Sequence, residues 1–498
     1  MSAGGFFDAR LGVLRDSADY VIVGSGAGGG AAARTLSKAG ASVVVLEEGP
    51  LADTAKSSPF FRESMARLFR ENGKMAAFGP ATIPILQGRC VGGTTHVNSA
   101  IIWRLPEKVL HDWHVRFGLG EGLPQRALDD AAAVLEAEMH VIAVDDSGVQ
   151  GENDRLLRLG AERAGIEHRY IHRSEQGCRG SARCLFGCPN DAKQSTALNY
   201  LRRAAADGAA VFANAKVERV VLEGGRAVAV VGRSGGKPFR VSAKRAVIVA
   251  ASAVQSPNLL ARSGVRGPEL GRHFMAHPGS TVMGLYPDVV NMWLGAAQGY
   301  EAYGLRDTLG VKIESINVPP EVIAARLPGA GPRFAQYLER LDHVAAWSIA
   351  VRAEGEGRTR PSRLFGDLLT YAVTSRDLDR MRQGLKRAAE MHFYAGATEV
   401  LPGVLGLPDV ITSPDELELF DDAPLTPAAY SMVATHLFGG CRAGSDAATS
   451  VVDPHLKVHG VDALYVMDAS VFPTNTGVNP QHSIMSIASV AAARLASA

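Results

Sequence analysis

The sequence predicts an α/β fold that contains a Rossmann-like nucleotide-binding domain. Residues 19–23 form a short apolar run typical of a buried strand, and residues 42–46 form a second one. Between them lie a glycine-rich turn, GSGAGG at residues 24–29, and an alanine-rich stretch that predicts a helix to about residue 38. A strand, a glycine turn, a helix and a second strand in this order indicate a dinucleotide-binding unit.

The glycine turn provides the positions that a dinucleotide needs. Gly24 allows the tight turn, Gly26 lets a pyrophosphate approach the backbone, and Gly29 allows close packing of helix and strand. Ala27 lies at the expected helix N-terminus, where free N–H groups and the helix dipole favour phosphates. Glu47 follows the second strand, and we expect its carboxylate to accept a hydrogen bond from a ribose hydroxyl.

Composition is ordinary for a globular protein. The 498 residues are 46% hydrophobic and 21% charged, and at roughly 150 residues per domain the length suggests about two to four domains. The net charge of +1 gives no reason to expect nucleic acid as a partner. We recognise no signal peptide and no apolar run near the roughly 18 residues of a transmembrane segment. The odd set of five cysteines favours a reducing compartment, so we expect a cytoplasmic protein.

Three further segments carry a family resemblance. They are GRCVGGTTHVNSAIIWR from Gly88, CRGSARCLFGCPNDAKQSTALNYLRRA from Cys178, and a C-terminal stretch that begins HLFGGCRAG at His436 and includes VMDASVFP and GVNPQHSI. With the glycine turn they resemble the glucose–methanol–choline (GMC) oxidoreductases, above all the bacterial alcohol dehydrogenases and the cholesterol-oxidase-like branch. The resemblance is clear over residues 1–100, 175–260 and 430–498.

The resemblance implies an interleaved architecture around FAD. The FAD-binding domain would comprise residues 1–275 and 430–498, and an antiparallel-sheet substrate domain would occupy residues 276–429, which match the family weakly. Residues 246–251 predict a buried strand, and residues 252–265 a helix and turn that return the chain to the cofactor. Ser252 stands where the family usually has glycine.

The resemblance also implies which residues line the cofactor. The glycine pair of GGTTHVN would let the backbone approach the flavin, and the asparagine would hydrogen-bond to it. The residues implied in this segment and elsewhere are Gly92, Gly93, Asn98, Val217, Asp468 and Ala469. Some relatives attach FAD covalently through a histidine just before that asparagine. Val97 occupies this position here, and His96, one residue earlier, is expected to be a polar loop residue, so FAD is expected to be held non-covalently.

His436 and Asn479 carry the catalytic chemistry that the resemblance implies. Oxidation of an alcohol removes a proton from oxygen and a hydride from carbon. A neutral imidazole with a pKa near 6.5 suits the proton step, so His436 is the expected general base. Asn479 would hold the substrate oxygen and orient its C–H bond toward the flavin. His482 is expected to be supporting or structural, and Gly440 and Ala443 replace a threonine and a methionine that are usual in the family.

The cysteines at 178, 184 and 188 raise the question of a metal centre. Their spacing is not that of a zinc site. Some family members bind an iron–sulfur cluster in this segment through adjacent cysteines, but Gly177 precedes Cys178. Plain thiols are favoured and no metal is expected, although a disulfide or a cluster stays open. Lys193 and Ser195 are expected to hold the loop over the flavin domain.

The favoured function is therefore FAD-dependent oxidation of an alcohol, by a dehydrogenase rather than an oxidase. The electron acceptor is open among oxygen, a quinone and a cytochrome. Apolar segments at residues 333–341 and 363–373 could form a lid over a pocket for a medium or large apolar alcohol, although for each segment alone a helix packed on a sheet is the favoured interpretation. A sugar or polyol substrate is the alternative, to be decided by the polarity of the pocket wall that residues 276–429 contribute. A non-catalytic flavin-binding protein is the alternative of another class.

Overall fold

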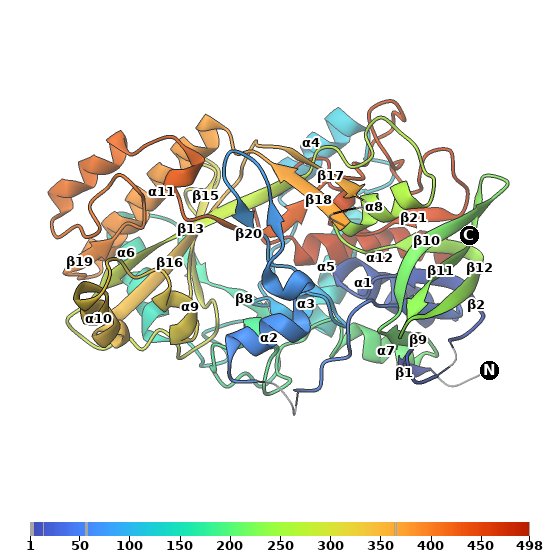
Figure 1. The fold of residues 1–498 in the computed structure, drawn as a ribbon, viewed down its shortest axis with the longest axis horizontal. Helices are drawn as coiled ribbons and strands as arrows, with labels where there is room; N and C mark the ends of the chain where they lie inside the picture. The colour runs from blue at the N-terminus through green and yellow to red at the C-terminus, as the bar shows by residue number, and fades with distance from the viewer. Residues whose placement is uncertain (1–3, 13, 55–57, 363, 365, 498) are drawn as a thin grey trace.

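The protein consists of two large sheets with helices packed around them (Figure 1). The structure is a computed structural model that describes residues 4–12, 14–54, 58–362, 364 and 366–497. Each sheet has an apolar core of its own. One core includes Val21, Val45 and Ile248, and the other includes Ile313 and Trp347.

The first sheet is mixed and is assembled from distant parts of the chain. The expected βαβ unit lies at the centre of its parallel portion. The strands there are continuous apolar runs, because helices bury both faces of a parallel sheet. In spatial order the strands are β1 (Gly5–Asp8), β9 (Ala210–Ala213), β3 (Val43–Leu46), β2 (Ser17–Val23), β12 (Lys237–Val249), β11 (Arg226–Ser234) and β10 (Lys216–Glu223), with β21 (Leu464–Val466) also pairing with β12. The last three of the path are antiparallel to one another.

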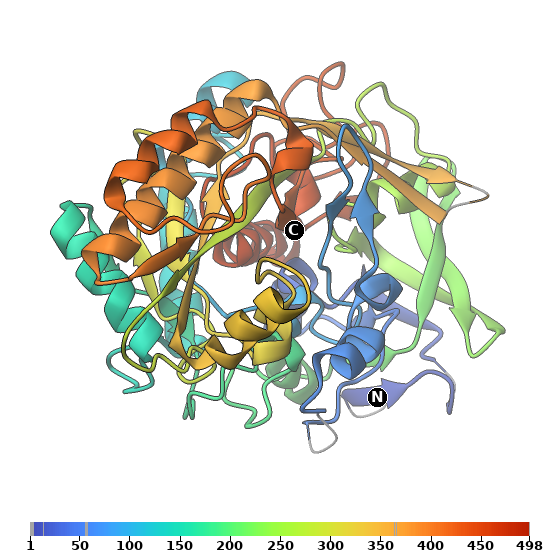
Figure 2. The same ribbon diagram turned by 60° about the vertical axis from the view of Figure 1, so that its left-hand side comes forward.

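Helix α1 (Ala27–Lys38) links β2 and β3 and packs against α12 (Gln481–Ser497) and α7 (Tyr200–Ala206). Helix α12 in turn packs against α5 (Gln125–Glu138). Figure 2 shows α12, in red, in the interior of the molecule. Asn479 lies two residues before the start of this helix. The helix therefore positions a candidate site residue deep in the protein.

The second sheet is antiparallel throughout. In spatial order its strands are β19 (Glu399–Leu401), β13 (Met275–Leu285), β16 (Val344–Val351), β15 (Val311–Ser315), β14 (Tyr300–Ala302) and β7 (His168–Tyr170), with β20 (Val433–Phe438) also pairing with β13. Helices α6 (Glu152–Ala164) and α11 (Ser375–Tyr394) pack on its outer face, at the left of Figure 1. The sheet thus draws β7 and β20 from outside residues 276–429, and the exact domain boundaries stay a prediction.

Smaller elements complete the chain. Three two-stranded sheets are formed by β4 (Ala76–Ala77) with β5 (Ile83–Pro84), β6 (Val141–Ala143) with β8 (His172–Ser174), and β17 (Gly357–Ser362) with β18 (Gly366–Tyr371). The other helices are α2 (Phe61–Leu68), α3 (Thr94–Val97), α4 (Glu107–Phe117), α8 (Gln255–Arg262), α9 (Pro320–Ala324) and α10 (Pro332–Glu339). Short 3-10 turns are η2 (Arg70–Gly73), η3 (Cys184–Phe186), η4 (Leu341–His343), η5 (Pro414–Asp422), η6 (Pro427–Ala429) and η7 (Ala469–Val471).

The two apolar segments considered as a lid differ in structure. Residues 333–341 lie mostly in α10, whereas residues 366–371 form β18, the second strand of a hairpin whose partner packs against α8. Arg363 and Phe365 of this segment lie outside the described residues. A helix was therefore the wrong expectation for the second segment, because its residues pair with β17 across the hairpin.

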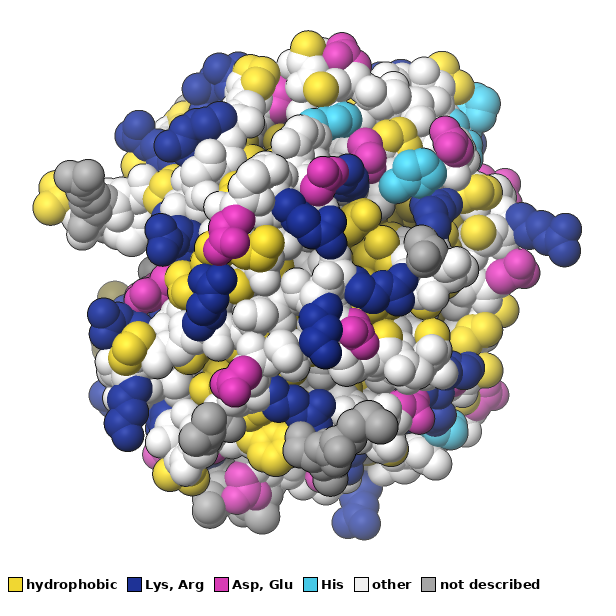
Figure 3. Space-filling view, turned by 90° about the vertical axis from the view of Figure 1, so that its right-hand side faces the viewer, with side chains coloured by type: hydrophobic (Ala, Val, Ile, Leu, Met, Phe, Trp, Pro, Cys, Tyr) yellow, Lys and Arg dark blue, Asp and Glu magenta, His cyan; other side chains and the backbone are white. Residues whose placement is uncertain are grey.

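The surface agrees with the small net charge. On the face shown in Figure 3, Lys and Arg side chains alternate with Asp and Glu rather than gathering in one area. No helix in the described part of the chain has the length and apolarity needed to cross a membrane.

Candidate active site

His436 and a second histidine, His277, face each other across neighbouring strands. Strand β20 pairs with β13 in antiparallel register, Met275 opposite Phe438 and Ala276 opposite Leu437, and the register shifts before Pro278. The shift is a β-bulge, a feature that often re-aims side chains beside active sites. Nδ1 of His277 lies 3.2 Å from Nδ1 of His436, and the two rings meet edge to face. His277 was not among the residues expected from the sequence.

The structure brings His436 and Asn479 together, as expected. Nδ2 of Asn479 lies 3.4 Å from Nε2 of His436. The end of β20 is tied to the segment after β21, because the Gly439 N–H donates to the carbonyl of Ala469. The side chain of Gln481, two residues past Asn479, accepts a hydrogen bond of 2.6 Å from Asn98. These bonds place the pair beside the segments expected to line the flavin.

A buried ionic cluster lies directly behind Asn479. Lys312 on β15 donates to Oδ1 of Asn479 at 2.5 Å and forms ion pairs with Glu301 at 3.0 Å and with Glu314 at 2.6 Å. Glu301 also accepts from Arg169 at 2.7 Å and from the indole of Trp103 at 2.8 Å. Lys312, Glu301 and Glu314 are all buried. None of these residues was among the expected site residues.

The cluster is the inner face of the second sheet. Gly384 lies on α11, and a side chain at this position would touch Val311 and Ile349. Val311 and Ile349 therefore face α11. Side chains alternate across a strand, so Lys312 and Glu314 point the other way, and Glu314 lies opposite Glu301 in the register. Gly279 and Ala350 share a row with Lys312, so the neighbours of Lys312 in this row are small.

Electrostatics keep the histidines neutral. Burial, with a further contribution from the Lys312 ammonium, lowers the pKa of His436 to about 3. Burial also lowers the pKa of His277, and His436 adds to the effect. His436 as a whole residue nevertheless keeps part of its surface accessible. Burial opposes the charges of Lys312 and Glu301 as well, but their mutual attraction outweighs it, so that the pKa of Lys312 is raised and that of Glu301 is lowered.

The glycine turn forms an open cradle at the start of α1. A side chain on Gly29 would lie 2.0 Å from the carbonyl oxygen of Gly24, so close helix–strand packing requires glycine there. A side chain on Gly26 would instead meet nothing within 4 Å. Gly26 caps α1 without a side-chain hydrogen bond, and the first turn from Ala27, described in full, carries no acidic residue. Free N–H groups facing open space suit a pyrophosphate, so these residues fit the dinucleotide.

Glu47 connects this turn with the second glycine loop. Its carboxylate accepts from the N–H and hydroxyl of Ser25, at 3.1 and 2.6 Å, and from the N–H of Gly49 at 2.9 Å. The hydroxyl of Ser25 accepts in turn from the N–H of Gly92 at 2.9 Å. Gly93 lies over Gly26, since its missing side chain would be 3.0 Å from the Gly26 Cα. A ribose bond to Glu47 stays a prediction, with lone pairs on its oxygens still to be used.

The remaining expected flavin contacts surround this cradle. Asp468 accepts from the N–H groups of Ser252 and Ser470, both at 2.8 Å, and its neighbour Ala469 begins η7. A side chain on Gly28, in the first turn of α1, would touch the carbonyl of Met467, so Asp468 lies next to the cradle. Val217 lies on β10, just after the segment that hydrogen-bonds to the backbone of residues 47–49. Ser252 adopts a φ of 96°, which explains why the family usually has glycine there.

Other expected residues support the loops around the site. Lys193 donates to the carbonyls of His96, Asn98 and Cys184 at 2.6 to 2.8 Å, so it ties the end of α3 to the cysteine segment. Ser195 lies 3.4 Å from the buried ring of His96. His482 contacts Glu136 at 3.2 Å on α5.

Two positions that depart from the family pattern fit their surroundings. Gly440 has a φ of 100°, and a side chain on it would lie 2.9 Å from Pro257. A threonine would be strained here, which accounts for the glycine. Ala443 is buried.

The cysteines form no disulfide with one another. All five belong to the described part of the chain, and each is a free thiol. Arg173 donates to the sulfur of Cys184 at 3.2 Å. Among the described residues, no three or more His, Cys, Asp or Glu side chains gather as a metal would require.

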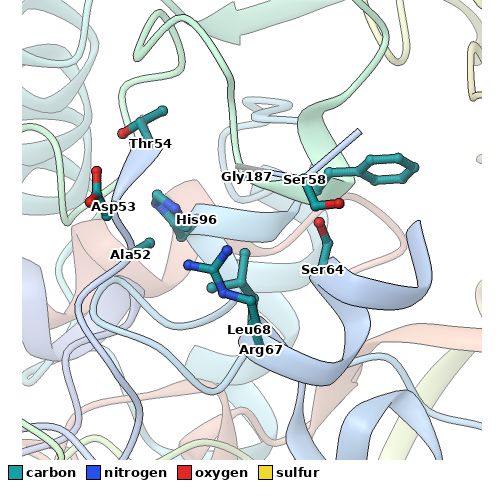
Figure 4. Close-up of a pocket in the computed structure, with 10 residues that line it drawn as sticks. Ala52, Asp53, Thr54, Ser58, Ser64, Arg67, Leu68, His96 and Gly187 are labelled. Atoms are coloured by element: carbon teal, nitrogen blue, oxygen red, sulfur yellow. The ribbon is translucent and has the colours of Figure 1, made fainter. Parts of the chain in front are cut away.

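A small pocket lies away from the reacting pair. Figure 4 shows it beside α3, with His96, Arg67, Ser64, Asp53 and Thr54 among its lining residues. His436 and Asn479 do not line it. The pocket is therefore not where the alcohol chemistry is expected.

Comparison with known proteins assigns the family. Models of the N- and C-terminal parts of GMC oxidoreductases match residues 65–279 and 363–488, and an FAD binding domain model matches residues 19–60. A GMC-type oxidoreductase of Mycobacterium tuberculosis, described as uncharacterized, is 37% identical over 95% of this chain and 74% of its own length. The protein belongs to the GMC oxidoreductase family. It is a flavin oxidoreductase whose cofactor is FAD.

More distant similarities agree with this assignment. A long-chain-alcohol oxidase of Arabidopsis thaliana is 29% identical over 96% of this chain and 67% of its own length. The crystal structure of pyridoxine 4-oxidase from Mesorbium loti matches with a TM-score of 0.73 and 18% identity, covering 96% of this chain and 98% of that one. The predicted fold class, a Rossmann-like FAD domain interleaved with an antiparallel substrate sheet, is thereby confirmed.

Proposed function

We propose that the protein oxidises the CH–OH group of an alcohol to a carbonyl. The observation that carries this proposal is the convergence of His436 and Asn479, 3.4 Å apart, next to the segments expected to line the flavin. FAD, when bound, supplies the acceptor for the hydride. The glycine turn, Glu47, the loop at Gly92 and the segment at Asp468 would hold it.

His436 and Asn479 have complementary tasks in this proposal. His436 is neutral at neutral pH, because its pKa is lowered to about 3 by burial and by Lys312, so its ring is in the unprotonated form that a general base requires. Lys312 holds Oδ1 of Asn479, which turns the amide N–H groups toward the substrate oxygen. The amide then supports the charge that develops on that oxygen as the proton leaves.

Anaerobic bleaching of the flavin tests the proposal. His436→Ala is expected to keep FAD but to slow flavin reduction by a factor of about 100 to 10,000, the usual contribution of a general base. Asn479→Ala should also slow reduction. His459→Ala serves as the control and should react as wild type, because the ring of His459 bonds Ser450 and the carbonyl of Gly444 rather than His436 or Asn479. Bleaching of the His436 variant at the wild-type rate would reject the proposed base. A yellow protein that no alcohol bleaches would indicate a non-catalytic flavoprotein.

For the substrate, we propose first a medium or long apolar alcohol, by analogy with the named long-chain-alcohol oxidase. A second candidate is a sugar or polyol, because the inner face of the second sheet carries Lys312, Glu314 and Glu301 beside Asn479. A panel of primary alcohols of increasing length and of polyols, with a dye acceptor and with oxygen, separates these candidates. A rise in kcat/KM with chain length supports the first, and turnover of polyols alone supports the second. The same panel distinguishes a dehydrogenase, which we favour, from an oxidase.

We also propose a cytoplasmic location, which the free thiols support.

A further inference from the structure

Five groups form one hydrogen-bonded chain through the active site. The Gly477 N–H donates to Nε2 of His277 at 3.1 Å, and Nδ1 of His277 contacts Nδ1 of His436 at 3.2 Å. Nε2 of His436 contacts Nδ2 of Asn479 at 3.4 Å, and Oδ1 of Asn479 accepts from Lys312 at 2.5 Å. A backbone N–H and an ammonium group can only donate, so both ends of the chain are donors. The positions of the hydrogens between them follow from this constraint.

Lys312 determines the orientation of the Asn479 amide. If the amide were reversed, two donors would stand 2.5 Å apart, so Oδ1 must face Lys312. The NH2 group of Asn479 therefore points at His436. At the other end, the Gly477 N–H donates to Nε2 of His277, so this nitrogen must be bare, that is, without a hydrogen. A neutral His277 therefore carries its hydrogen on Nδ1.

This arrangement leaves one hydrogen too many at the catalytic pair. The Nδ1–H of His277 requires a bare Nδ1 on His436, so a neutral His436 carries its hydrogen on Nε2. That N–H and the N–H of Asn479 then point at each other across the longest contact in the chain, 3.4 Å. An oxygen without a hydrogen of its own, such as that of a carbonyl product, would accept from both. A hydroxyl that must give up its proton needs a bare Nε2 instead.

We propose that His277 is a positioning residue that sets the tautomer of His436. His436 is able to accept the alcohol proton on Nε2 only when its own hydrogen lies on Nδ1, which requires His277 to present a bare Nδ1 and to carry its hydrogen on Nε2. The two rings therefore change tautomer together. This inference rests on the proposed function, in which His436 is the base.

Asn475 supplies an acceptor beside His277 for the second tautomer. Its amide nitrogen donates to the carbonyl of Ala353, which leaves Oδ1 directed elsewhere. This oxygen is buried and, among the described groups, has no hydrogen-bond partner of ordinary geometry. The Asn475 side chain raises the pKa of His277, which means that it favours a proton on that ring. His277 thus lies between an N–H donor, Gly477, and an unused acceptor, Asn475. Gly477 thus favours the tautomer with an unprotonated Nε2, whereas the Asn475 side chain favours a hydrogen on the His277 ring.

The charged and titratable groups around His277 oppose a third state in which it is protonated. They are His436 on β20, Lys312 on β15 and Arg352 after β16, and all three lower the pKa of His277 together with burial. His277 is consequently neutral, with one hydrogen to place. The tautomer, rather than the charge, is what this residue controls.

Two substitutions test the role of His277, with anaerobic flavin reduction at saturating alcohol as the readout. His277→Leu removes the contact and should slow reduction by roughly ten- to a hundredfold, the loss typical when the partner that orients a functional imidazole is removed. FAD content and the alcohol Kd should stay at wild-type values. His277→Asn can donate or accept toward His436, so it should recover most of the rate. Equal loss in both variants would overturn the proposal, because packing alone would then explain it.

A double-mutant cycle separates this inference from the proposed function. If His277 acts only through His436, then His277→Leu should have no further effect in the His436→Ala background. The same slowing in both backgrounds would overturn the positioning role. If His436→Ala itself reacts as wild type, the proposed function fails instead. His392→Leu is the matched control, because His392 is a buried histidine of the same domain that stacks on Trp347, and it should leave the reduction rate unchanged.

Discussion

The imidazole of His436 lies among groups that oppose its protonation. Its ring is deep in the protein, the Lys312 ammonium is close by, and His277 offers a neutral contact rather than a carboxylate. A free histidine titrates near pH 6.5, as the sequence alone suggests. In the folded protein, burial moves the pKa of His436 to about 3, so the neutral base form persists far into the acidic range.

The pH dependence of flavin reduction should therefore lack a histidine step near neutrality. The base form exists above the pKa and is lost only as the pH falls through about 3. We expect the rate of anaerobic flavin reduction to be constant from about pH 5 to pH 9. Stopped-flow measurements across this range check the prediction. A rise in rate centred between pH 6 and 7 would contradict the assigned environment of His436.

A second prediction concerns Glu47, a carboxylate that holds Ser25 and Gly49 and is expected to bind the ribose. Glu47→Ala should weaken FAD binding by roughly ten- to a hundredfold, since a hydrogen bond to a charged group contributes about 1.5–3 kcal/mol. FAD retention on dilution measures the effect. Glu48→Ala is the matched control, because Glu48 is the half-buried neighbour of Glu47 and pairs with Arg70 at 3.0 Å rather than with the glycine turn. Equal FAD loss in both variants would argue against a specific ribose contact.

At the scale of elements, the inner face of the second sheet depends on Lys312. Glu301 and Glu314 lie directly opposite each other on β14 and β15, and like charges in that position repel. Lys312 bridges them with ion pairs of 3.0 and 2.6 Å. Its removal would leave two buried carboxylates facing each other, with Arg169 as the cation still paired with Glu301.

Lys312→Met should accordingly destabilise the protein by about 3–5 kcal/mol, the usual cost of breaking a buried ion pair. The control is Lys108→Met, since Lys108 forms an exposed pair with Asp307 and should contribute no more than about 1 kcal/mol. Urea unfolding followed by circular dichroism compares the two variants. Similar midpoints for both would show that the cluster contributes little to stability.

Elements determined by local sequence were predictable, and those determined by a distant surface were not. The strands at 19–23 and 42–46 and the helix between them match β2, β3 and α1 closely, because the apolar runs and the glycine turn specify them locally. Lys312 and Glu314, which alternate with apolar neighbours on β15, were not among the expected site residues, because such alternation is typical of a strand with one side facing solvent. The structure buries that side, because other parts of the chain cover the inner face of the sheet.

The catalytic pair was predictable for a different reason. His436 and Asn479 lie in motifs that resemble the family, and the structure brings them within contact distance. The region that contains His277, Lys312 and Glu301 has no recognisable motif. These residues lie on β13, β14 and β15, strands of three to eleven residues. A lone histidine on a strand carries no functional signal until the register of β13 with β20 places it opposite His436.

At the scale of the whole molecule, the expected FAD contacts come from four distant parts of the chain. They are the glycine turn, the loop at Gly92, β10 at Val217 and the segment at Asp468. A ligand that binds only the folded state stabilises it by RT ln(1 + [L]/Kd), about 2.7 kcal/mol at a hundredfold excess over Kd. Bound FAD should therefore join these parts and raise the stability of the entire protein.

We accordingly expect the melting temperature of flavin-free protein to rise steadily with added FAD, and to respond little to FMN, which lacks the adenosine half whose ribose Glu47 is expected to bind. Val97 stands where relatives carry the linking histidine, and it is buried, so the flavin should be held without a covalent bond. Acid precipitation should then release intact FAD into the supernatant, identified by chromatography. Flavin that stays with the precipitate would reject non-covalent binding. A melting temperature that responds equally to FMN would show that the adenosine end contributes no affinity and that the glycine turn has another role.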